Sequence, residues 1–221
     1  VYFDPDCPHC QKMLPERETV ARKAALARPN VVFLVCDTLR ADRTSTYGHG
    51  RETTPNLDAL AARGAVFERA FAMSSWTLPS MSMLMTGEVK SLADPSILPD
   101  HVHIAESFLD AGYDTAAVVA KPILNDRLGY DRGIEDFVVD RAQQMSWRAG
   151  EVGERGLQWV DGRDDGSQPF FLWLHPVDPH HPYEPEAGLR FDELDESTTR
   201  DAARLALEAE RERHPESVLG G

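Results

Sequence analysis

Cysteine is scarce in this chain, with 3 residues among 221, and this excludes a small fold held together by many disulfides. Two of the three, Cys7 and Cys10, are close neighbours near the start of the chain. The third, Cys36, ends an apolar run, where a free cysteine usually behaves as a small buried hydrophobic residue. At 221 residues the chain is long enough for one sizeable α/β domain that folds around a hydrophobic core.

Long apolar runs and an excess of basic residues are also missing. No run approaches the roughly 20 apolar residues that a membrane-spanning helix needs, and no signal-peptide pattern opens the sequence. Lys and Arg number 23 against 37 Asp and Glu, for a net charge of −14. This balance argues against a nucleic-acid partner, because phosphate backbones favour clustered positive charge. The first residue is Val rather than Met, so we expect the chain to begin inside a longer reading frame.

Extended and helical patterns alternate along the chain, which indicates an α/β fold with a mainly parallel central sheet flanked by helices. Short apolar runs typical of buried parallel strands occupy residues 31–36, 115–120 and 169–175, and residues 65–71 also fit a strand. Helical patterns cover residues 55–64, 104–111, 143–160 and 197–213, and a further helix is predicted to begin at Pro79. Folds of this class bind ligands at the carboxyl ends of their strands, which points to Asp37 and to the segment after His175.

Asp37 is the first chemical candidate, because it ends the apolar strand at residues 31–36. A carboxylate there suits a hard cation such as Ca²⁺ or Mg²⁺, which prefer oxygen ligands. The alternative is a structural role as the N-cap of a following helix, a position that Asp often takes.

Thr77 is the second candidate. Its hydroxyl lies just ahead of the helix predicted from Pro79, where the helix dipole and a nearby metal would stabilise a nucleophile. The alternative is a Thr that only caps the helix.

Three histidines within seven residues, His175, His180 and His181, form the third candidate. Their spacing does not match a structural zinc site, which makes zinc improbable. A Pro-rich loop in which histidines cap neighbouring groups is the structural alternative. A histidine titrates near neutrality, so His180 could serve as a general acid.

The blocks around these candidates resemble the sulfatase family of the alkaline-phosphatase superfamily. The segment Pro-Asn-Val-Val-Phe-Leu-Val-Cys-Asp-Thr-Leu-Arg-Ala-Asp (residues 29–42) is similar to the family's opening block, and Thr-Thr-Pro-Asn-Leu-Asp (residues 53–58) also fits it. The segments Thr-Leu-Pro-Ser-Met (residues 77–81) and Leu-Met-Thr-Gly (residues 84–87) match the family's nucleophile motif in part. The resemblance implies a sulfatase-like α/β domain.

Three positions depart from the family pattern. The family's opening block carries two consecutive Asp metal ligands, and the second position is Thr38 here. Its nucleophile is a Cys or Ser that is oxidised to formylglycine, whereas Thr77 could give only a ketone. Met81 replaces the Arg that holds the formylglycine hydrate. These departures leave two options: Thr77 acts directly, as in the superfamily's phosphoethanolamine and glycerol-phosphate transferases, or the fold is kept with little classical sulfatase activity.

The resemblance implies roles for further residues. It suggests hydrolysis of a sulfate or phosphate ester of a small molecule or glycan, with Ca²⁺ as the expected cation and Mg²⁺ as the alternative. Asp37 would bind the metal, Thr77 would occupy the nucleophile position, and His180 would contact the substrate or the leaving-group oxygen. Lys121 lies at a strand end where the family often has a substrate-binding Lys; the alternative is an ordinary surface Lys. The family leans towards an extracytoplasmic location.

The first residues support a competing hypothesis. The segment Asp-Pro-Asp-Cys-Pro-His-Cys (residues 4–10) resembles the active site of thioredoxin-like oxidoreductases, in which Cys7 would attack and Cys10 would resolve the mixed disulfide. Only about 25 residues share this resemblance, too few for an independent core. We therefore expect a remnant or linker over residues 1–27, a sulfatase-like domain over residues 28–190, and an acidic helical tail over residues 191–221. Family domains are much longer, so we also expect a truncated domain with an incomplete site.

Overall fold

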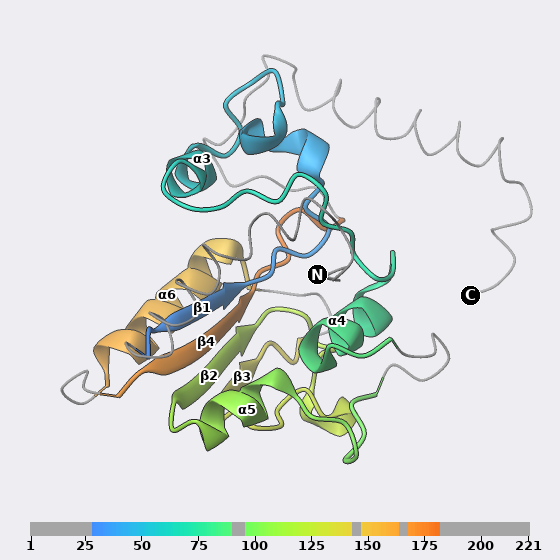
Figure 1. The fold of residues 1–221 in the computed structure, drawn as a ribbon, viewed down its shortest axis with the longest axis vertical. Helices are drawn as coiled ribbons and strands as arrows, with labels where there is room; N and C mark the ends of the chain where they lie inside the picture. The colour runs from blue at the N-terminus through green and yellow to red at the C-terminus, as the bar shows by residue number, and fades with distance from the viewer. Residues whose placement is uncertain (1–27, 90–95, 143–146, 164–167, 182–221) are drawn as a thin grey trace, which may run out of the picture. The chain divides into compact units, whose positions relative to one another are not determined.

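The computed structural model describes residues 28–89, 96–142, 147–163 and 168–181. Its centre is a parallel sheet of four strands, β1 (Val31–Leu34), β2 (Asp114–Val119), β3 (Asp136–Val139) and β4 (Phe170–His175). The strands lie in the spatial order β1-β4-β2-β3 (Figure 1). The last strand of the sequence therefore lies between the first two, which brings segments far apart in the chain side by side.

Within the described residues, four α-helices accompany the sheet: α3 (Pro55–Ala61), α4 (Thr77–Thr86), α5 (Ile104–Asp110) and α6 (Ala149–Asp161). Helix α4 begins two residues earlier than the sequence predicts, so Thr77 is its first residue and Pro79 its third. The first N–H groups of a helix have no partner within the helix, and Pro79 therefore loses no hydrogen bond at this position. Gly87 ends α4 in a left-handed conformation, as helices commonly end.

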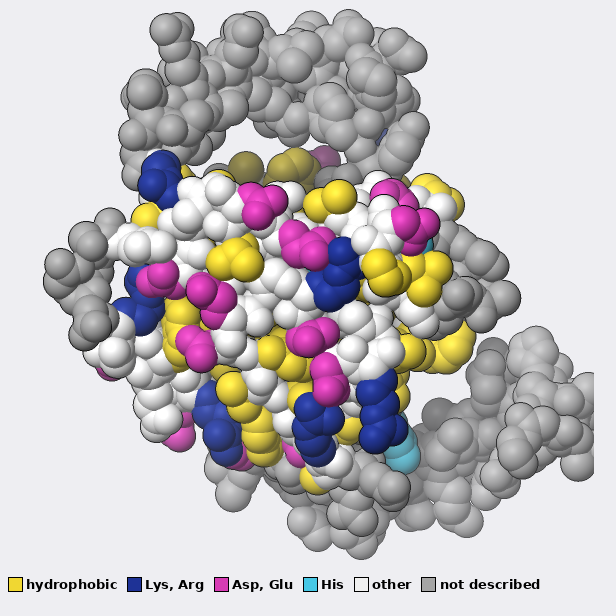
Figure 2. All heavy atoms as spheres, turned by 90° about the horizontal axis from the view of Figure 1, so that it is seen from below, with side chains coloured by type: hydrophobic (Ala, Val, Ile, Leu, Met, Phe, Trp, Pro, Cys, Tyr) yellow, Lys and Arg dark blue, Asp and Glu magenta, His cyan; other side chains and the backbone are white. Residues whose placement is uncertain are grey.

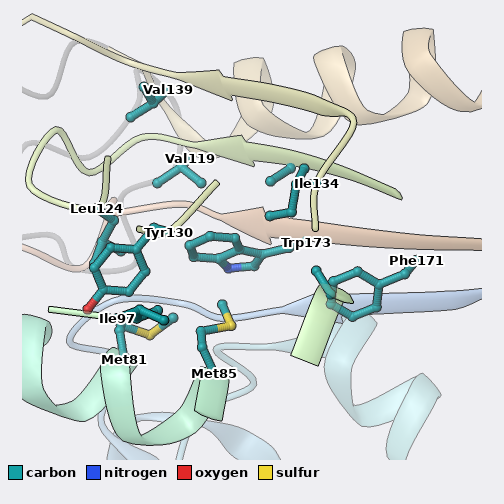
Figure 3. Close-up of a cluster of buried hydrophobic side chains, with 12 residues drawn as sticks. Met81, Met85, Ile97, Val119, Leu124, Tyr130, Ile134, Val139, Phe171 and Trp173 are labelled. Carbon is teal, nitrogen blue, oxygen red and sulfur yellow. The ribbon is translucent and has the colours of Figure 1, made fainter. Parts of the chain in front are cut away.

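Helices cover the two faces of the sheet. Alternate side chains of the central strands β2 and β4 point to opposite faces. On one face, Val119, Phe171 and Trp173 pack with Met81 and Met85 of α4 (Figure 3). On the other face, the neighbouring strand residues pack with α6: Ala116, Phe170 and Leu172 contact Trp159 and Val160, and Val118 contacts Val152. The predicted α/β fold with a parallel central sheet is confirmed.

Several sequence-based expectations are wrong in detail. Residues 65–71 form no strand, and the side chains of Phe67 and Phe71 are exposed. Strand β1 is not fully buried, because it lies at an edge of the described sheet and Val32 and Leu34 are about half exposed. Strand β3 was not predicted. The predicted helix at residues 197–213, the thioredoxin-like segment at 1–27 and the start of the predicted helix at 143–160 lie outside the described residues.

One face of the described surface carries mixed charge. Figure 2 shows acidic, basic and hydrophobic side chains next to one another over one face of the molecule, without a broad region of a single sign. Among the helices that the structure describes, none is long and apolar enough to cross a membrane.

Candidate functional site

Three of the four strands deliver a polar side chain to the same edge of the sheet. Asp37 follows β1, Lys121 follows β2, and His175 is the last residue of β4. The carboxyl ends of adjacent parallel strands meet at one edge, and this order places β4 between the other two. Asp37 N–H donates to the carbonyl of Pro176 at 3.1 Å, which continues the pairing of the two strands beyond their ends.

Asp37 is the centre of this cluster. Lys121 Nζ lies 3.0 Å from Asp37 Oδ2, and each of these two side chains is only 8% exposed. Thr77 Oγ1 donates a long hydrogen bond of 3.4 Å to the same oxygen. His175 Nε2 lies 3.8 Å from it, a close electrostatic contact beyond ordinary hydrogen-bond length. One carboxylate oxygen therefore faces an ammonium, a hydroxyl and an imidazole.

The charges at the cluster follow from its burial. Burial alone raises the pKa of Asp37, but His175 and the Lys121 ammonium outweigh it and hold that pKa at about 2. Burial lowers the pKa of His175, and the nearby Asp37 only partly opposes this shift. At neutral pH Asp37 is thus an anion paired with the Lys121 cation, and His175 is a neutral imidazole.

Thr77 is positioned by helix α4. As the first residue of this ten-residue helix, it lies at the end where the helix dipole favours negative charge. The next residue is tied to the core, because the buried Tyr130 donates a hydrogen bond from its hydroxyl to the carbonyl of Leu78 at 2.9 Å. This hydrogen bond fixes the first turn of α4 against the segment that follows β2.

A cavity of about 690 Å³ opens in front of the cluster. Asp37, Thr77 and His175 line it, whereas Lys121 does not. Cys36 also lines the cavity, but burial and, to a smaller extent, the charge of Asp178 raise the pKa of its thiol. The thiol therefore stays protonated at neutral pH, and a protonated thiol is a weak nucleophile.

Thr38 has an unusual backbone conformation next to this cavity. Its φ is 59°, in the left-handed region that a β-branched residue rarely adopts. Such conformations cost of order 1–3 kcal/mol and are often found at functional sites. Asn, Asp and Gly tolerate this region better than Thr does. The backbone at position 38 would therefore suit an Asp.

The structure brings together three of the predicted site residues, Asp37, Thr77 and Lys121. His180 is not among the residues that line the cavity, and its Nδ1 donates to the carbonyl of His181 at 2.7 Å. His175 belongs to the group of three histidines singled out in the sequence, but the site role was predicted for His180; the position of His175 at the end of an apolar strand was the available signal for its place in the site. Cys7 and Cys10 lie outside the described residues.

The side chains at the site supply few of the ligands that a divalent metal needs. Within the described residues, no group of three or more His, Cys, Asp or Glu side chains is placed to hold a metal ion. Asp37 offers one carboxylate, and Lys121 already neutralises its Oδ2. Since Ca²⁺ takes about six to eight oxygen ligands and Mg²⁺ about six, these residues fit as one part of a metal site and do not make a complete one.

Structural comparison defines the class of the protein. A protein of the alkaline phosphatase superfamily from Vibrio parahaemolyticus superposes with a TM-score of 0.61, 20% identity, and coverage of 79% of this chain and 46% of that one. The C-terminal periplasmic domain of EcEptC from Escherichia coli, solved in complex with Zn, gives a TM-score of 0.60, 19% identity, and coverage of 76% and 49%. The fold is that of the alkaline-phosphatase and sulfatase proteins.

Sequence comparison then gives the family. The family model for sulfatases matches residues 29–209, and the chain belongs to the sulfatase family. It is 22% identical over 184 residues to the N-acetylglucosamine-6-O-sulfatase of Bacteroides thetaiotaomicron, a match that covers 74% of this chain and 33% of the relative. The chain thus spans about a third of the length of this curated relative and just under half of the two solved chains.

Proposed function

We propose that this chain carries the nucleophile-bearing part of a sulfatase-like hydrolase that acts on sulfate esters with a divalent cation. The observation that carries the proposal is the position of Thr77. Its hydroxyl lies at the start of α4, faces the cavity, and is 3.4 Å from a carboxylate at the end of β1. Family membership supports the reaction class.

The charge balance supports the need for a cation. A sulfate ester is an anion, and it would approach Thr77 next to the Asp37 carboxylate. Lys121 supplies one positive charge, and Asp37 already balances it at 3.0 Å. The described residues that line the cavity include no Lys or Arg. Additional positive charge would stabilise the bound ester and the transition state. We expect Ca²⁺, with Mg²⁺ as the alternative, with Asp37 as one ligand and the others from outside the described residues.

The proposed chemistry uses the unmodified Thr77. Thr77 Oγ1 forms a bond to the sulfur of the ester as the bond between sulfur and the leaving-group oxygen breaks. The Thr77 proton passes to water, and a water molecule in the cavity donates a proton to the leaving alcohol, because the predicted general acid His180 does not line this cavity. Water then cleaves the sulfated Thr77 and releases sulfate. Asp37, with a pKa of about 2, is too weak a base to take the proton at neutral pH, so its role is electrostatic and positional.

The substrate class follows from the relatives. The name of the Bacteroides thetaiotaomicron relative describes a sulfatase that acts on N-acetylglucosamine 6-O-sulfate, and we propose a sulfated sugar or another small sulfate ester for this protein. A phosphate ester, with transfer through a phosphorylated Thr77, is a second candidate. Met81 favours it, because this side chain is 3% exposed in the apolar core where the sulfatase pattern has an Arg.

Covalent labelling tests the nucleophile. The protein is incubated with 4-nitrophenyl sulfate or 4-nitrophenyl phosphate in the presence of Ca²⁺ or Mg²⁺, quenched in acid, and mapped by peptide mass spectrometry. A sulfo or phospho group on Thr77 supports the proposal, and the productive ester decides between the two candidates. Thr77→Ala should abolish labelling, whereas Ser80→Ala, which removes another hydroxyl of the same cavity, should not. Labelling that persists in Thr77→Ala contradicts the assignment.

Calcium titration by calorimetry tests the cation. Asp37→Ala should abolish the heat of binding, and Asp42→Ala, which removes an exposed carboxylate paired with Arg40, should leave it unchanged. Thr38→Asp adds a second carboxylate beside the first and should tighten binding. The absence of heat in both the wild-type protein and Thr38→Asp would count against a calcium site that includes Asp37.

A further inference from the structure

The cavity in front of Thr77 has an apolar wall that the chemistry proposed above does not use. Five large apolar side chains that line it are at least a third exposed: Leu39 at 37%, Phe71 at 79%, Met73 at 40%, Trp76 at 54% and Val89 at 76%. Two of them are aromatic, and Trp76 directly precedes the proposed nucleophile. Large apolar side chains left open to water beside a polar group are typical of binding sites for small molecules.

The wall belongs to the same concave site as the nucleophile. Leu39 lies two residues after Asp37 on the segment after β1, and residues 70–76 lead directly into Thr77 at the start of α4. Each of these two segments of the wall is therefore next to a residue of the polar cluster. The volume of about 690 Å³ exceeds what a tetrahedral sulfate group needs, and lies within the range of roughly 300–1,000 Å³ that is usual for sites of small organic ligands. The space next to the wall is therefore available to the rest of an ester.

The charges of the cavity limit what that group can carry. Among the described residues that line it, the ionised side chains are Asp37 and Glu88, and both are acidic. Lys121 balances Asp37, and an oxygen of Glu88 lies 3.7 Å from Nε2 of His101. A second sulfate on the leaving group would meet an acidic and apolar surface, whereas an uncharged ring would meet aromatic faces.

We propose that Phe71 and Trp76, with Leu39 and Met73, form the leaving-group subsite of the enzyme, and that this subsite selects a ring with an apolar face and no second anionic group. This inference rests on the proposed function, because the subsite would bind the part of the same ester that lies away from the sulfate. The sulfate lies at Thr77 and the ring lies against the wall. Contacts of this kind hold the ester in place while the reacting bond is aligned with the nucleophile.

Equilibrium binding tests the subsite. Phenyl sulfate, methyl sulfate and benzene-1,3-diyl bis(sulfate) are titrated into the labelled protein and followed by NMR, with the indole N–H of Trp76 assigned from Trp76→Phe. Burial of a ring face predicts that phenyl sulfate binds about tenfold tighter than methyl sulfate. The bis(sulfate) should bind more weakly than phenyl sulfate, and Glu88→Gln should reduce that difference.

Matched variants separate the wall from the rest of the surface. Phe71→Ala and Trp76→Ala should remove most of the preference for the ring and leave methyl sulfate binding unchanged. Phe67→Ala removes a similarly exposed aromatic side chain, at 49%, that does not line the cavity, and should retain the preference. All three side chains are exposed, so none of these substitutions should prevent folding.

The outcomes distinguish the subsite from the proposed function. Equal affinity for phenyl and methyl sulfate overturns the subsite and leaves the function standing. Binding of phenyl sulfate that is lost in Trp76→Ala, but that methyl sulfate does not compete with, shows a ring site separate from Thr77 and overturns the leaving-group subsite. The proposed function fails separately, if the labelling experiment above finds no group on Thr77. No binding of phenyl sulfate overturns the subsite.

Discussion

Lys121 and Asp37 form a buried ion pair, with 3.0 Å between Nζ and Oδ2, and the strand β4 lies between the two strands that these residues follow. Asp37 follows β1 and Lys121 follows β2, and these strands contact β4 rather than each other. The pair therefore joins the loops at the carboxyl ends of two strands that share no hydrogen bond.

Loss of Lys121 should be costly. Lys121→Met leaves a buried carboxylate without its cation, and we expect the free energy of unfolding to fall by about 3–5 kcal/mol. Urea denaturation at neutral pH measures it. Arg141→Met, which removes an exposed pair with Asp126, should cost no more than about 1 kcal/mol. The double variant Asp37→Asn with Lys121→Met should recover much of the loss, and a double variant no more stable than Lys121→Met would contradict the ion-pair explanation.

The pH dependence of stability should report Asp37. Its pKa is about 2 in the folded protein, below its usual value of 3.8, so the folded state favours the anion. This contribution is fully present above pH 3.8 and is lost as the pH falls towards 2. It amounts to about 2 kcal/mol. Urea midpoints at pH 5 and at pH 2.5 should therefore differ more in the wild-type protein than in Asp37→Asn, while Asp161→Asn, at the exposed end of α6, should keep the wild-type difference.

Two glycines should respond in opposite directions to the same substitution. Gly133 has a φ of 71°, and a Cβ there would lie 2.3 Å from the backbone nitrogen of Glu106, so Gly133→Ala requires the backbone to shift. We expect a loss of more than about 2 kcal/mol in the free energy of unfolding. Gly153 lies within α6 with open space around it, and Gly153→Ala should stabilise the protein by about 0.5–1 kcal/mol. Thermal denaturation of the two variants compares them directly, and a stabilised Gly133→Ala would refute the close contact.

The hydrogen bond of Tyr130 should stabilise the start of α4. Tyr130→Phe leaves the carbonyl of Leu78 without this donor in a buried setting, and we expect a loss of about 1–2 kcal/mol. Tyr47→Phe is the matched control, because Tyr47 also donates to a backbone carbonyl, that of Phe67 at 3.0 Å, but is exposed. Its loss should be within about 0.5 kcal/mol. If the labelling of Thr77 also slows in Tyr130→Phe, the first turn of α4 positions the nucleophile.

The sequence predicted the fold class and the central strands because their apolar residues pack on both faces of the sheet. The two central strands, β2 and β4, occupy the runs predicted at residues 115–120 and 169–175, and helices cover them on both faces. The prediction failed where that condition does not hold. The run at residues 65–71 is apolar enough for a strand, but Phe71 lines the cavity instead of the core. Strand β3 has only four residues, of which two are exposed and one is buried, so its apolar pattern in the sequence is weak.

The candidate site could be predicted residue by residue but not as a set of contacts. Asp37 and Thr77 stand out because of their positions at the end of a strand and the start of a helix. The contact between Asp37 and Lys121 depends on the spatial order of the strands, which periodicity does not encode. His175 faces Asp37 only because β4 lies between β1 and β2. The sequence pattern of β4 alone does not show which residue His175 contacts.

The contacts of the polar cluster depend on the register with which β1 and β2 pair with β4. Leu34 is opposite Leu174, and Val119 is opposite His175. A shift of β1 by two residues would keep its apolar side chains on the correct faces, yet it would carry Asp37 about 6–7 Å along the sheet and away from Lys121. The hydrophobic core would therefore accept a two-residue shift of β1, whereas the ion pair between Asp37 and Lys121 would be lost. The cluster would thus also penalise misaligned folding, so a spectroscopic probe of the ion pair would follow the step at which the sheet acquires its native alignment.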